Sequence, residues 1–370
     1  MRKLFSLVAL FALALGLVPS SGTVQAQAGG PEYGAAAFML GHPETTDIQL
    51  QRMTEAGLSW VRVDIPWRSI EASCQDCFDW TDLDRVVAAT NATGIRIMAS
   101  VHRSPAWSRQ VPVENGPPDA MSDYADFLRA VAERYYAGSP FGTIHAIQVW
   151  NEPNLSREWG NAVIDREQAS QYMYMLKESY KAIKAVDPSK TVVSAGLSPT
   201  GTNDGTAQPD DVYLSWLYDS GLAQYSDAIG MHAPGFGSPP EAEPLSNPAF
   251  PHPSFYFRRI EQLRDIMVLN GDAGKRAWIN EFGWTTDQVN PQYSWYAVTP
   301  EQQAEYIVRA YRYAATNWSG WVGPMFVWNI ADPTWTPEYE HYWWSITEPD
   351  GTPRPAYLAL QAARTDGTLP

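Results

Sequence analysis

Residues 60–101, WVRVDIPWRSIEASCQDCFDWTDLDRVVAATNATGIRIMASV, contain two strand-like runs with a helix-like run between them. In Trp60–Ile65 the side chains alternate as they do in a strand, and Ile95–Val101 is a second strand-like run. Between them, Trp80–Thr93 has the apolar spacing of a helix and carries a Thr-Asp cap near its start. Two strands joined through a helix lie parallel in one sheet, so this stretch predicts a right-handed βαβ unit.

The same alternation continues along the rest of the chain and gives eight strand–helix pairs. The expected strands are Tyr33–Leu40, Trp60–Ile65, Ile95–Val101, Ala146–Asn151, Thr191–Leu197, Ala228–His232, Arg276–Glu281 and Gly323–Asn329; the expected helices are Asp47–Gly57, Trp80–Thr93, Met121–Ala137, Arg166–Val186, Asp211–Ser220, Phe255–Leu269, Pro300–Thr316 and Pro355–Thr365. Eight such pairs predict an α/β fold, a single (β/α)8 TIM barrel. A doubly wound open sheet is the competing fold, but its glycine-rich phosphate turn is missing after the first strand.

The first 26 residues have the pattern of a secretory signal peptide. Arg2-Lys3 precedes an apolar run, Leu4–Val18, and small residues follow up to Ala26. The run is 15 residues long, shorter than a membrane-spanning helix needs, so a retained anchor is the weaker alternative. We expect residues 27–370 to form the barrel domain of a secreted protein, extracellular or periplasmic, with no membrane contact after cleavage.

Composition limits the partners that this protein can have. A chain with 45% hydrophobic and 13% aromatic residues can bury a core, which excludes disorder. Without Arg2 and Lys3 it carries 24 basic against 41 acidic residues, a formal charge of −17. Such a surface repels phosphate backbones and anionic lipids, so we expect no nucleic acid and no membrane partner. We expect a monomer that binds a neutral or cationic molecule.

The two cysteines, Cys74 and Cys77, are separated by two residues. In an exported protein the surroundings are oxidising, and a short disulfide that closes a loop is the favoured interpretation. A redox pair or half of a zinc site is less favoured, because the sequence has no second cysteine pair and no thioredoxin-like context.

Polar residues lie at the carboxyl ends of the expected strands, where barrel enzymes place their catalytic groups. They are Arg62, Asp64, His102, Asn151, Glu152, His232 and Glu281, with Trp328 at the end of the last strand. Glu152 and Glu281 end the fourth and seventh strands, on opposing sides of an eight-strand ring. A facing carboxyl pair is what glycosidic bond cleavage requires, because one group protonates the leaving oxygen while the other attacks the anomeric carbon or activates water. A structural ion pair is the alternative for either glutamate alone.

VWNEPN at 149–154 and AWINEFGW at 277–284 resemble the acid/base and nucleophile motifs of clan A retaining glycoside hydrolases. The wider pattern, with WVRVDIPW at 60–67, FDW at 78–80 and HRSPAW at 102–107, is most similar to family 39-like and cellulase-like, family 5-type members. The resemblance covers nearly all of the chain after its first 26 residues. It implies that Glu152 is the general acid/base, that Glu281 is the nucleophile, and that Asn151 hydrogen-bonds the sugar 2-hydroxyl.

Three further strand-end residues are candidates for substrate binding. Arg62 points into the barrel mouth and can keep Glu281 ionised, although an ion pair with Asp64 is an equal alternative. His102 and His232 can orient a carboxylate or contact sugar hydroxyls, or be structural. The sequence has no His-x-His at a strand end and no His-Glu-x-x-His, so we expect neither a metal nor another cofactor.

Tryptophans and long loops add candidate sugar-stacking surfaces. Trp328 is expected to form the floor of the cleavage subsite, and Trp284 is a candidate platform in a loop above the barrel. The enlarged loops are Ser198–Asp210, Ala233–Ser254, Trp284–Thr299 and Ile330–Arg354, and further tryptophans in predicted loops are Trp107, Trp159, Trp295, Trp335, Trp343 and Trp344. Each of these indoles has a core position as its alternative.

These observations together predict a secreted retaining β-glycoside hydrolase that cleaves a poly- or oligosaccharide by double displacement. Loop composition favours endo action. A transglycosylase using the same site, or a non-catalytic carbohydrate-binding barrel, is the alternative, and a metal-dependent amidohydrolase is disfavoured. The mechanism also predicts that the pKa of Glu152 is raised by burial and by the charge of Glu281.

Overall fold

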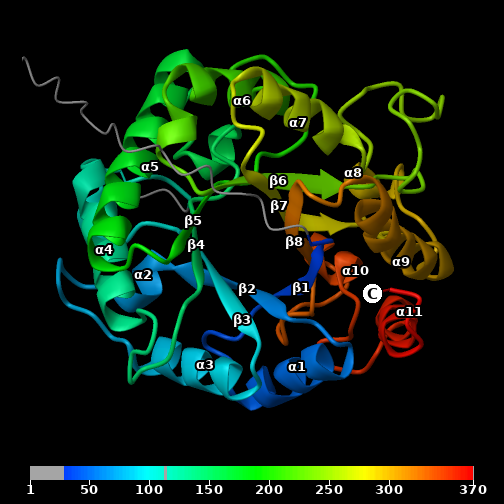
Figure 1. Ribbon diagram of the computed structural model, residues 1–370, viewed down its shortest axis with the longest axis horizontal. Helices are drawn as coiled ribbons and strands as arrows, with labels where there is room; N and C mark the ends of the chain where they lie inside the picture. The colour runs from blue at the N-terminus through cyan, green and yellow to red at the C-terminus, as the bar shows by residue number, and fades with distance from the viewer. Residues whose placement is uncertain (1–28, 112–114, 370) are drawn as a thin grey trace, which may run out of the picture.

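The computed structural model describes residues 29–111 and 115–369. Eight parallel strands form a closed barrel in the order of the chain, and helices surround it (Figure 1). The strands are β1 (Glu32–Ala37), β2 (Trp60–Pro66), β3 (Arg96–His102), β4 (Ala146–Val149), β5 (Thr191–Ser194), β6 (Ala228–Pro234), β7 (Arg276–Gly283) and β8 (Val322–Val327). Pairing of β1 with β8 closes the ring, and the predicted (β/α)8 barrel is confirmed.

Each pair of consecutive strands is joined through a helix, and the last helix follows β8. The main helices are α1 (Pro43–Glu55), α3 (Thr81–Ala92), α4 (Met121–Arg134), α5 (Arg166–Val186), α6 (Asp210–Asp219), α7 (Arg259–Leu269), α9 (Pro300–Asn317) and α11 (Pro355–Thr365). Short helical turns lie in the loops: α2 (Trp67–Ile70), α8 (Pro291–Ser294), α10 (Glu340–Trp344), η1 (Ala106–Ser108), η2 (Ser156–Glu158) and η3 (Leu222–Gln224). The expected signal peptide lies outside the described residues.

The ends of two elements differ from the sequence prediction for identifiable reasons. Helix α7 begins at Arg259 instead of Phe255, because Phe255 and Tyr256 pack into an aromatic cluster of the preceding loop. Strand β4 ends at Val149 instead of Asn151, because Trp150 has a left-handed backbone with φ 69°. A strand cannot continue through that conformation.

The barrel interior is built in layers, because every second side chain of a strand points inward. Seven apolar side chains fill the lower layer: Trp60, Met98, Ala146, Val193, Ala228, Trp278 and Phe326. Two residues further along their strands come the buried polar groups Arg62, Ser100, Gln148 and Asn280. Two further still are Asp64, His102 and His232, at the mouth, and Trp328, directly after β8, lies two residues beyond Phe326 of the lower layer. The larger core, between barrel and helices, is a separate apolar cluster.

Strand β7 departs from this spacing next to the mouth. The β6–β7 register shifts after Met231, so that Ile279 pairs with Met231 while Glu281 pairs with His232. The irregularity brings an odd-numbered residue, Glu281, to the inner side of the barrel mouth, as bulges near active sites do.

Cys74 and Cys77 form a disulfide in the loop between α2 and α3, as predicted. A search of the described helices for one with the length and apolar content to cross a bilayer finds none.

Candidate active site

The loop after β4 holds Glu152 in an unusual backbone conformation. Trp150 and Glu152 both have positive φ, 69° and 41°. Such conformations cost roughly 1–3 kcal/mol each in non-glycine residues and persist where the surroundings enforce them. Here the amide of Glu152 donates to the carbonyl of Gly196 at 3.1 Å, and Asn154 exchanges two hydrogen bonds with the backbone of Ser198. The strained turn fixes Glu152 against the end of β5.

Glu281 is held from β7 by a buried arginine. Nη1 of Arg62 lies 3.0 Å from Oε1 of Glu281. The remaining guanidinium nitrogens donate to the side chains of Gln148, Ser100 and Asn151, at 2.9–3.0 Å. Arg62 therefore contacts Glu281 as a charged donor held in a fixed position. Of the two alternatives for Arg62, the ion pair with Glu281 is the one present, because Asp64 pairs with His102 instead.

His232 lies between the two glutamates. Its Nδ1 is 3.0 Å from Oε1 of Glu152, and its Nε2 is 3.6 Å from Oε1 of Glu281. One donor or acceptor atom of each of the three residues lies within 4.8 Å of the others. The imidazole needs a glycine beside it, because a Cβ at Gly196 would lie 2.1 Å from the ring. The predicted facing of Glu152 and Glu281 across the mouth is therefore present.

The charge state of Glu152 differs from the sequence prediction. Burial acts to raise the pKa of this carboxyl, but the hydrogen bond and charge of His232, the charge of Arg157 and a hydrogen bond from Ser198 outweigh it. They lower the pKa of Glu152 to about 2. The expected rise is thus wrong for the unliganded protein, because the prediction counted burial and Glu281 but not these partners.

A second buried carboxyl, Glu158, lies close to this pair. Burial and then the charge of Glu152 raise the pKa of Glu158 to about 7, against the opposing charges of Arg157 and Arg103. Arg157 lies between the two carboxylates, 3.6 Å from Glu152 and 3.4 Å from Glu158, with its side chain 70% exposed. Sequence analysis singled out neither residue, although both follow the VWNEPN motif within six positions of Glu152.

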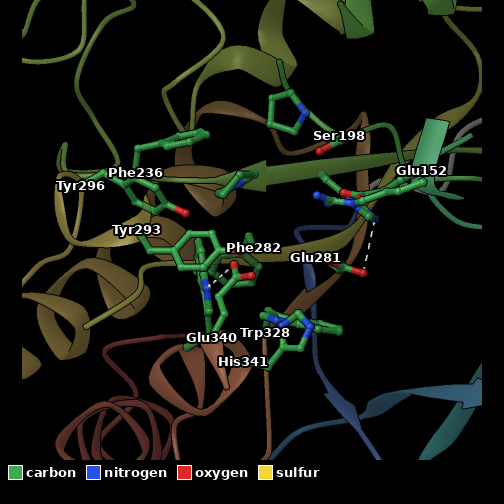
Figure 2. Close-up of a pocket in the computed structure, with 16 residues that line it drawn as sticks. Glu152, Ser198, Phe236, Glu281, Phe282, Tyr293, Tyr296, Trp328, Glu340 and His341 are labelled. Carbon is green, nitrogen blue, oxygen red and sulfur yellow. Dashed lines mark hydrogen bonds and ion pairs between the residues drawn. The ribbon is translucent and has the colours of Figure 1, made fainter. Parts of the chain in front are cut away.

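A pocket lies above the two carboxylates and is walled by the enlarged loops (Figure 2). Trp328, which follows β8, lines it, and its role as a stacking floor stays a prediction. Pocket-lining side chains that the sequence did not single out are Arg157, Ser198, Phe236, Tyr293, Tyr296, Glu340 and His341. All four loops that were expected to be enlarged contribute to this wall.

The remaining predicted polar residues lie beside the pocket. Oδ1 of Asn151 accepts hydrogen bonds from Arg62 and Gln148, which leaves the amide nitrogen of Asn151 for another partner. His102 is paired with Asp64. Burial raises the pKa of Asp64, but the charge and hydrogen bond of His102 and the charges of Arg103 and Arg62 lower it overall. Asp64 lines a second hollow, so the carboxylate that His102 hydrogen-bonds belongs to that hollow.

Trp284 is a correction to the sequence prediction. Its indole is 0% exposed, packs against Phe257 and Tyr306, and donates its N–H to the carbonyl of Ser238. It follows β7 directly, so helix α9 and the residues before α7 cover it. A side chain without exposed surface cannot stack on a sugar. Trp159 and Trp344 are also buried, at 2% and 7% exposed, although Trp344 borders the pocket.

Glu152, His232 and Glu281 also have the composition of a metal-ligand set. Arg62, however, lies 3.0 Å from Glu281, and a fixed guanidinium repels a cation at that carboxylate. The donors present therefore fit acid–base and nucleophilic chemistry better than metal binding.

The barrel and the facing carboxylates define a glycoside hydrolase of the clan A type. Residues 26–323 match the family model "Cellulase (glycosyl hydrolase family 5)", so the chain belongs to glycosyl hydrolase family 5. No curated protein gave a sequence match.

Solved structures with the same fold are similar to this chain at low identity. A family 39 glycoside hydrolase from Bacteroides cellulosilyticus WH2 has a TM-score of 0.67 and 19% identity, covering 90% of this chain and 63% of its own. A glucosidase from Croceicoccus marinus has a TM-score of 0.63 and 15% identity, and the match covers 89% of this chain and 66% of the glucosidase. GH5_18 from Streptomyces cattleya, in complex with GlcNAc, has a TM-score of 0.61 and 15% identity, and the match covers 92% of this chain and 80% of GH5_18. The chain thus spans somewhat less than two thirds of the first two proteins.

Proposed function

We propose that this protein is a secreted retaining β-glycoside hydrolase that cuts a β-linked poly- or oligosaccharide internally. The observation that carries the proposal is the separation of Glu152 and Glu281, which have carboxylate oxygens within 4.8 Å of each other. Retaining enzymes hold their carboxyl groups about 5–5.5 Å apart, and inverting enzymes about 6.5–9.5 Å apart to admit a water. The spacing supports direct attack by one carboxylate.

In the first step, Oε1 or Oε2 of Glu281 attacks the anomeric carbon, and the bond to the leaving oxygen breaks as Glu152 gives that oxygen a proton. In the second step, Glu152 takes a proton from water, and the water oxygen displaces Glu281 from the anomeric carbon. Arg62 supports the nucleophile role, because it keeps negative charge on Glu281 favourable until the bond forms. The free amide nitrogen of Asn151 supports a hydrogen bond to the 2-hydroxyl.

Hollows on two sides of Trp328 support endo action. The first contains Glu152 and Glu281, and the second is lined by Phe38, Asp64, Arg103 and Asp332. Trp328 lines the first hollow and Phe38 the second, and their rings are in edge contact, with centroids 5.5 Å apart. A sugar chain that continues in both directions from the carboxylates would occupy both hollows.

Export is supported by the sequence of residues 1–26 and by the Cys74–Cys77 disulfide, which suits an oxidising compartment. N-terminal sequencing of protein from the culture medium or periplasm tests this part. A mature N-terminus near Gln27 is expected, and an intact N-terminus in the cytoplasm would contradict it.

The experiment for the activity is a screen of purified protein against soluble β-glucans, mannans and xylans, with sizing of the products. Hydrolysis to a ladder of intermediate oligosaccharides supports endo action, and release of a single small sugar contradicts it. Proton NMR of the first products should show the β-anomer before mutarotation. Activity should be unchanged by EDTA. Products longer than the substrate would favour transglycosylation, and binding without turnover would favour a non-catalytic barrel.

A further inference from the structure

Trp295, in the loop between β7 and α9, carries an exposed indole next to the catalytic pocket. We propose that Trp295, supported by Phe236 and Tyr296, forms a second carbohydrate platform that stacks a further sugar unit of the substrate chain. The inference rests on the proposed function, because it assigns this surface to the same glycan that the carboxylates cut.

Trp295 is the one tryptophan among the described residues with more than half of its side chain exposed, at 51%. All 16 tryptophans of the chain fall in the described part, and the others are covered wholly or largely by neighbouring groups. An exposed indole face next to a sugar pocket gains free energy when a ligand covers it, so its position, and not its exposure alone, supports the proposal.

Four aromatic rings hold the indole in place. Its ring centroid lies 4.8 Å from Tyr296, 5.7 Å from Phe250, 5.9 Å from Phe255 and 6.4 Å from Phe236. Its N–H donates to the carbonyl of Gln292 at 3.0 Å. The polar edge of the indole is therefore already bonded within the protein. What remains for a ligand is an apolar ring face in a fixed orientation.

The platform is continuous with the pocket. Phe236 and Tyr296 both line the pocket and both pack against Trp295. Figure 2 shows Phe236 and Tyr296 on the side of the pocket away from Glu152 and Ser198. A sugar chain that leaves the carboxylates along this side therefore meets the indole directly after the pocket wall.

The chemistry of the surface selects a neutral glycan. The rings in contact with Trp295 are Phe236, Phe250, Phe255 and Tyr296, so the surface around the indole is aromatic. The apolar face of a pyranose matches an indole face, as sugar rings present C–H groups on one side. The protein's net charge of −15 also disfavours an anionic chain.

The test compares a short and a long substrate in Trp295→Ala. With an aryl β-glycoside of one sugar, which fills only the catalytic subsite, kcat/KM should change less than twofold. With the polysaccharide that the screen identifies, kcat/KM should fall about 10-fold, the loss expected for one aromatic stacking contact. Trp295→Phe keeps a ring and should recover part of this loss. Tyr136→Ala, which removes a 43% exposed ring following α4, should leave both values unchanged.

A binding experiment separates failure of the platform from failure of the proposed function. Glu281→Ala, with and without Trp295→Ala, is run in native gels containing hydroxyethylcellulose, glucomannan or soluble xylan. If one of these polysaccharides slows the protein in the gel and Trp295→Ala reduces this retardation, the platform is supported, whether or not hydrolysis is found. Retardation and hydrolysis that Trp295→Ala leaves unchanged would overturn the platform while the hydrolase stands. Equal losses on the short and long substrates would make Trp295 a structural residue, and no retardation in any gel would also overturn the inference.

Discussion

Nδ1 of His232 lies 3.0 Å from Oε1 of Glu152, so the carboxylate that we propose as the acid/base shares a hydrogen bond with a buried imidazole. The protonation of Glu152 therefore depends on a neighbouring ring as well as on the facing nucleophile. With the pKa of Glu152 lowered to about 2, the unliganded protein keeps this group ionised. An acid must carry a proton when the glycosidic bond breaks. Substrate binding has to weaken the groups that hold the charge, and the exposed Arg157 is the one that a sugar can displace.

Arg157→Gln should move the alkaline limb of the kcat/KM profile to higher pH. The positive charge 3.6 Å from Glu152 favours the ionised carboxylate, so its removal raises the pKa of Glu152. Because the pKa of Glu152 is about 2 in the free enzyme, kcat/KM at ordinary pH already lies on this descending limb, and a higher pKa moves the limb to higher pH. The measurement is the pH dependence of aryl glycoside hydrolysis.

The control for this prediction is Arg166→Gln. Arg166 is also an exposed arginine in an ion pair, with Asp219, but it begins α5 and does not line the pocket. Its removal should leave the limb in place. An alkaline limb of Arg157→Gln that stays fixed, or moves to lower pH, would show that the guanidinium does not act on Glu152.

Glu158→Gln should flatten the pH dependence of stability between about pH 4.5 and 7. Because the pKa of Glu158 is raised to about 7 in the folded state, the folded protein binds this proton more tightly than the unfolded chain. The proton on Glu158 therefore adds to the free energy of unfolding. This contribution, about 3 kcal/mol at most, is fully present below the unfolded pKa near 4.5 and is lost as the pH rises to 7.

Urea unfolding at a series of pH values measures this effect. The stability of Glu158→Gln relative to the unsubstituted protein should increase from pH 5 to pH 7.5, because the glutamine amide never ionises. Gln also keeps an oxygen for the hydrogen bond that Asn115 donates to Glu158. A constant difference across this range would contradict the raised pKa.

Trp328→Ala should lower kcat/KM at least about 10-fold while the fold survives. The indole lines the pocket, is in edge contact with Phe38, and receives the guanidinium of Arg62 at 5.7 Å from its ring. Its loss removes the floor under a sugar at the carboxylates. Trp328→Phe should keep part of the activity. Steady-state kinetics with a thermal unfolding scan tests this, and unchanged turnover with a normal transition would make Trp328 purely structural.

The inward-pointing side chains at the strand ends could be predicted, because their direction follows from the period of the strand alone. Once Trp60, Arg62 and Asp64 alternate on one strand, their inward direction is fixed by strand geometry, and the same holds for His232 and Trp328. This placement left two equal partners for Arg62, Glu281 and Asp64, and the structure shows the ion pair with Glu281. The loop residues could not be predicted in this way, since no period fixes where a loop side chain points.

Trp284 and Trp295 illustrate the difference. Both belong to the loop after β7 and look alike in the sequence, yet tertiary packing buries the first between Phe257 and Tyr306 and leaves the second 51% exposed. The lowered pKa of Glu152 was missed for the same reason. It depends first on the hydrogen bond and charge of His232, and then on the loop residues Arg157 and Ser198, whose positions no period in the sequence fixes.

Replacing Cys74 and Cys77 by serine should lower the free energy of unfolding by about 2 kcal/mol, the chain-entropy value for so short a ring. The disulfide lies between α2 and α3, away from the carboxylates, so the aryl glycoside kcat/KM should stay within about twofold. Thiol titration of denatured, unreduced protein should find no free sulfhydryl. Two free thiols in exported protein would contradict the bond.

The roles of Glu152 and Glu281 are separated by their alanine variants with an activated aryl β-glycoside. Glu152→Ala should still form the glycosyl-enzyme, because a good leaving group needs no proton, whereas a poor leaving group should lose roughly 10²–10⁴-fold. Hydrolysis of the glycosyl-enzyme then limits turnover, because this second step lacks its base. Azide needs no base, so it should restore turnover and give the β-glycosyl azide, with retained configuration.

Glu281→Ala should lose the covalent step, and azide should enter the space that the carboxylate leaves. Attack from that side inverts the anomeric carbon and gives the α-glycosyl azide. The carboxylate oxygens within 4.8 Å of each other and the ion pair of Arg62 with Glu281 support this assignment of Glu281. NMR of the two azide products gives the configuration directly. The same anomer from both variants would mean that Glu152 and Glu281 do not act from opposite faces, and double displacement by this pair would be wrong.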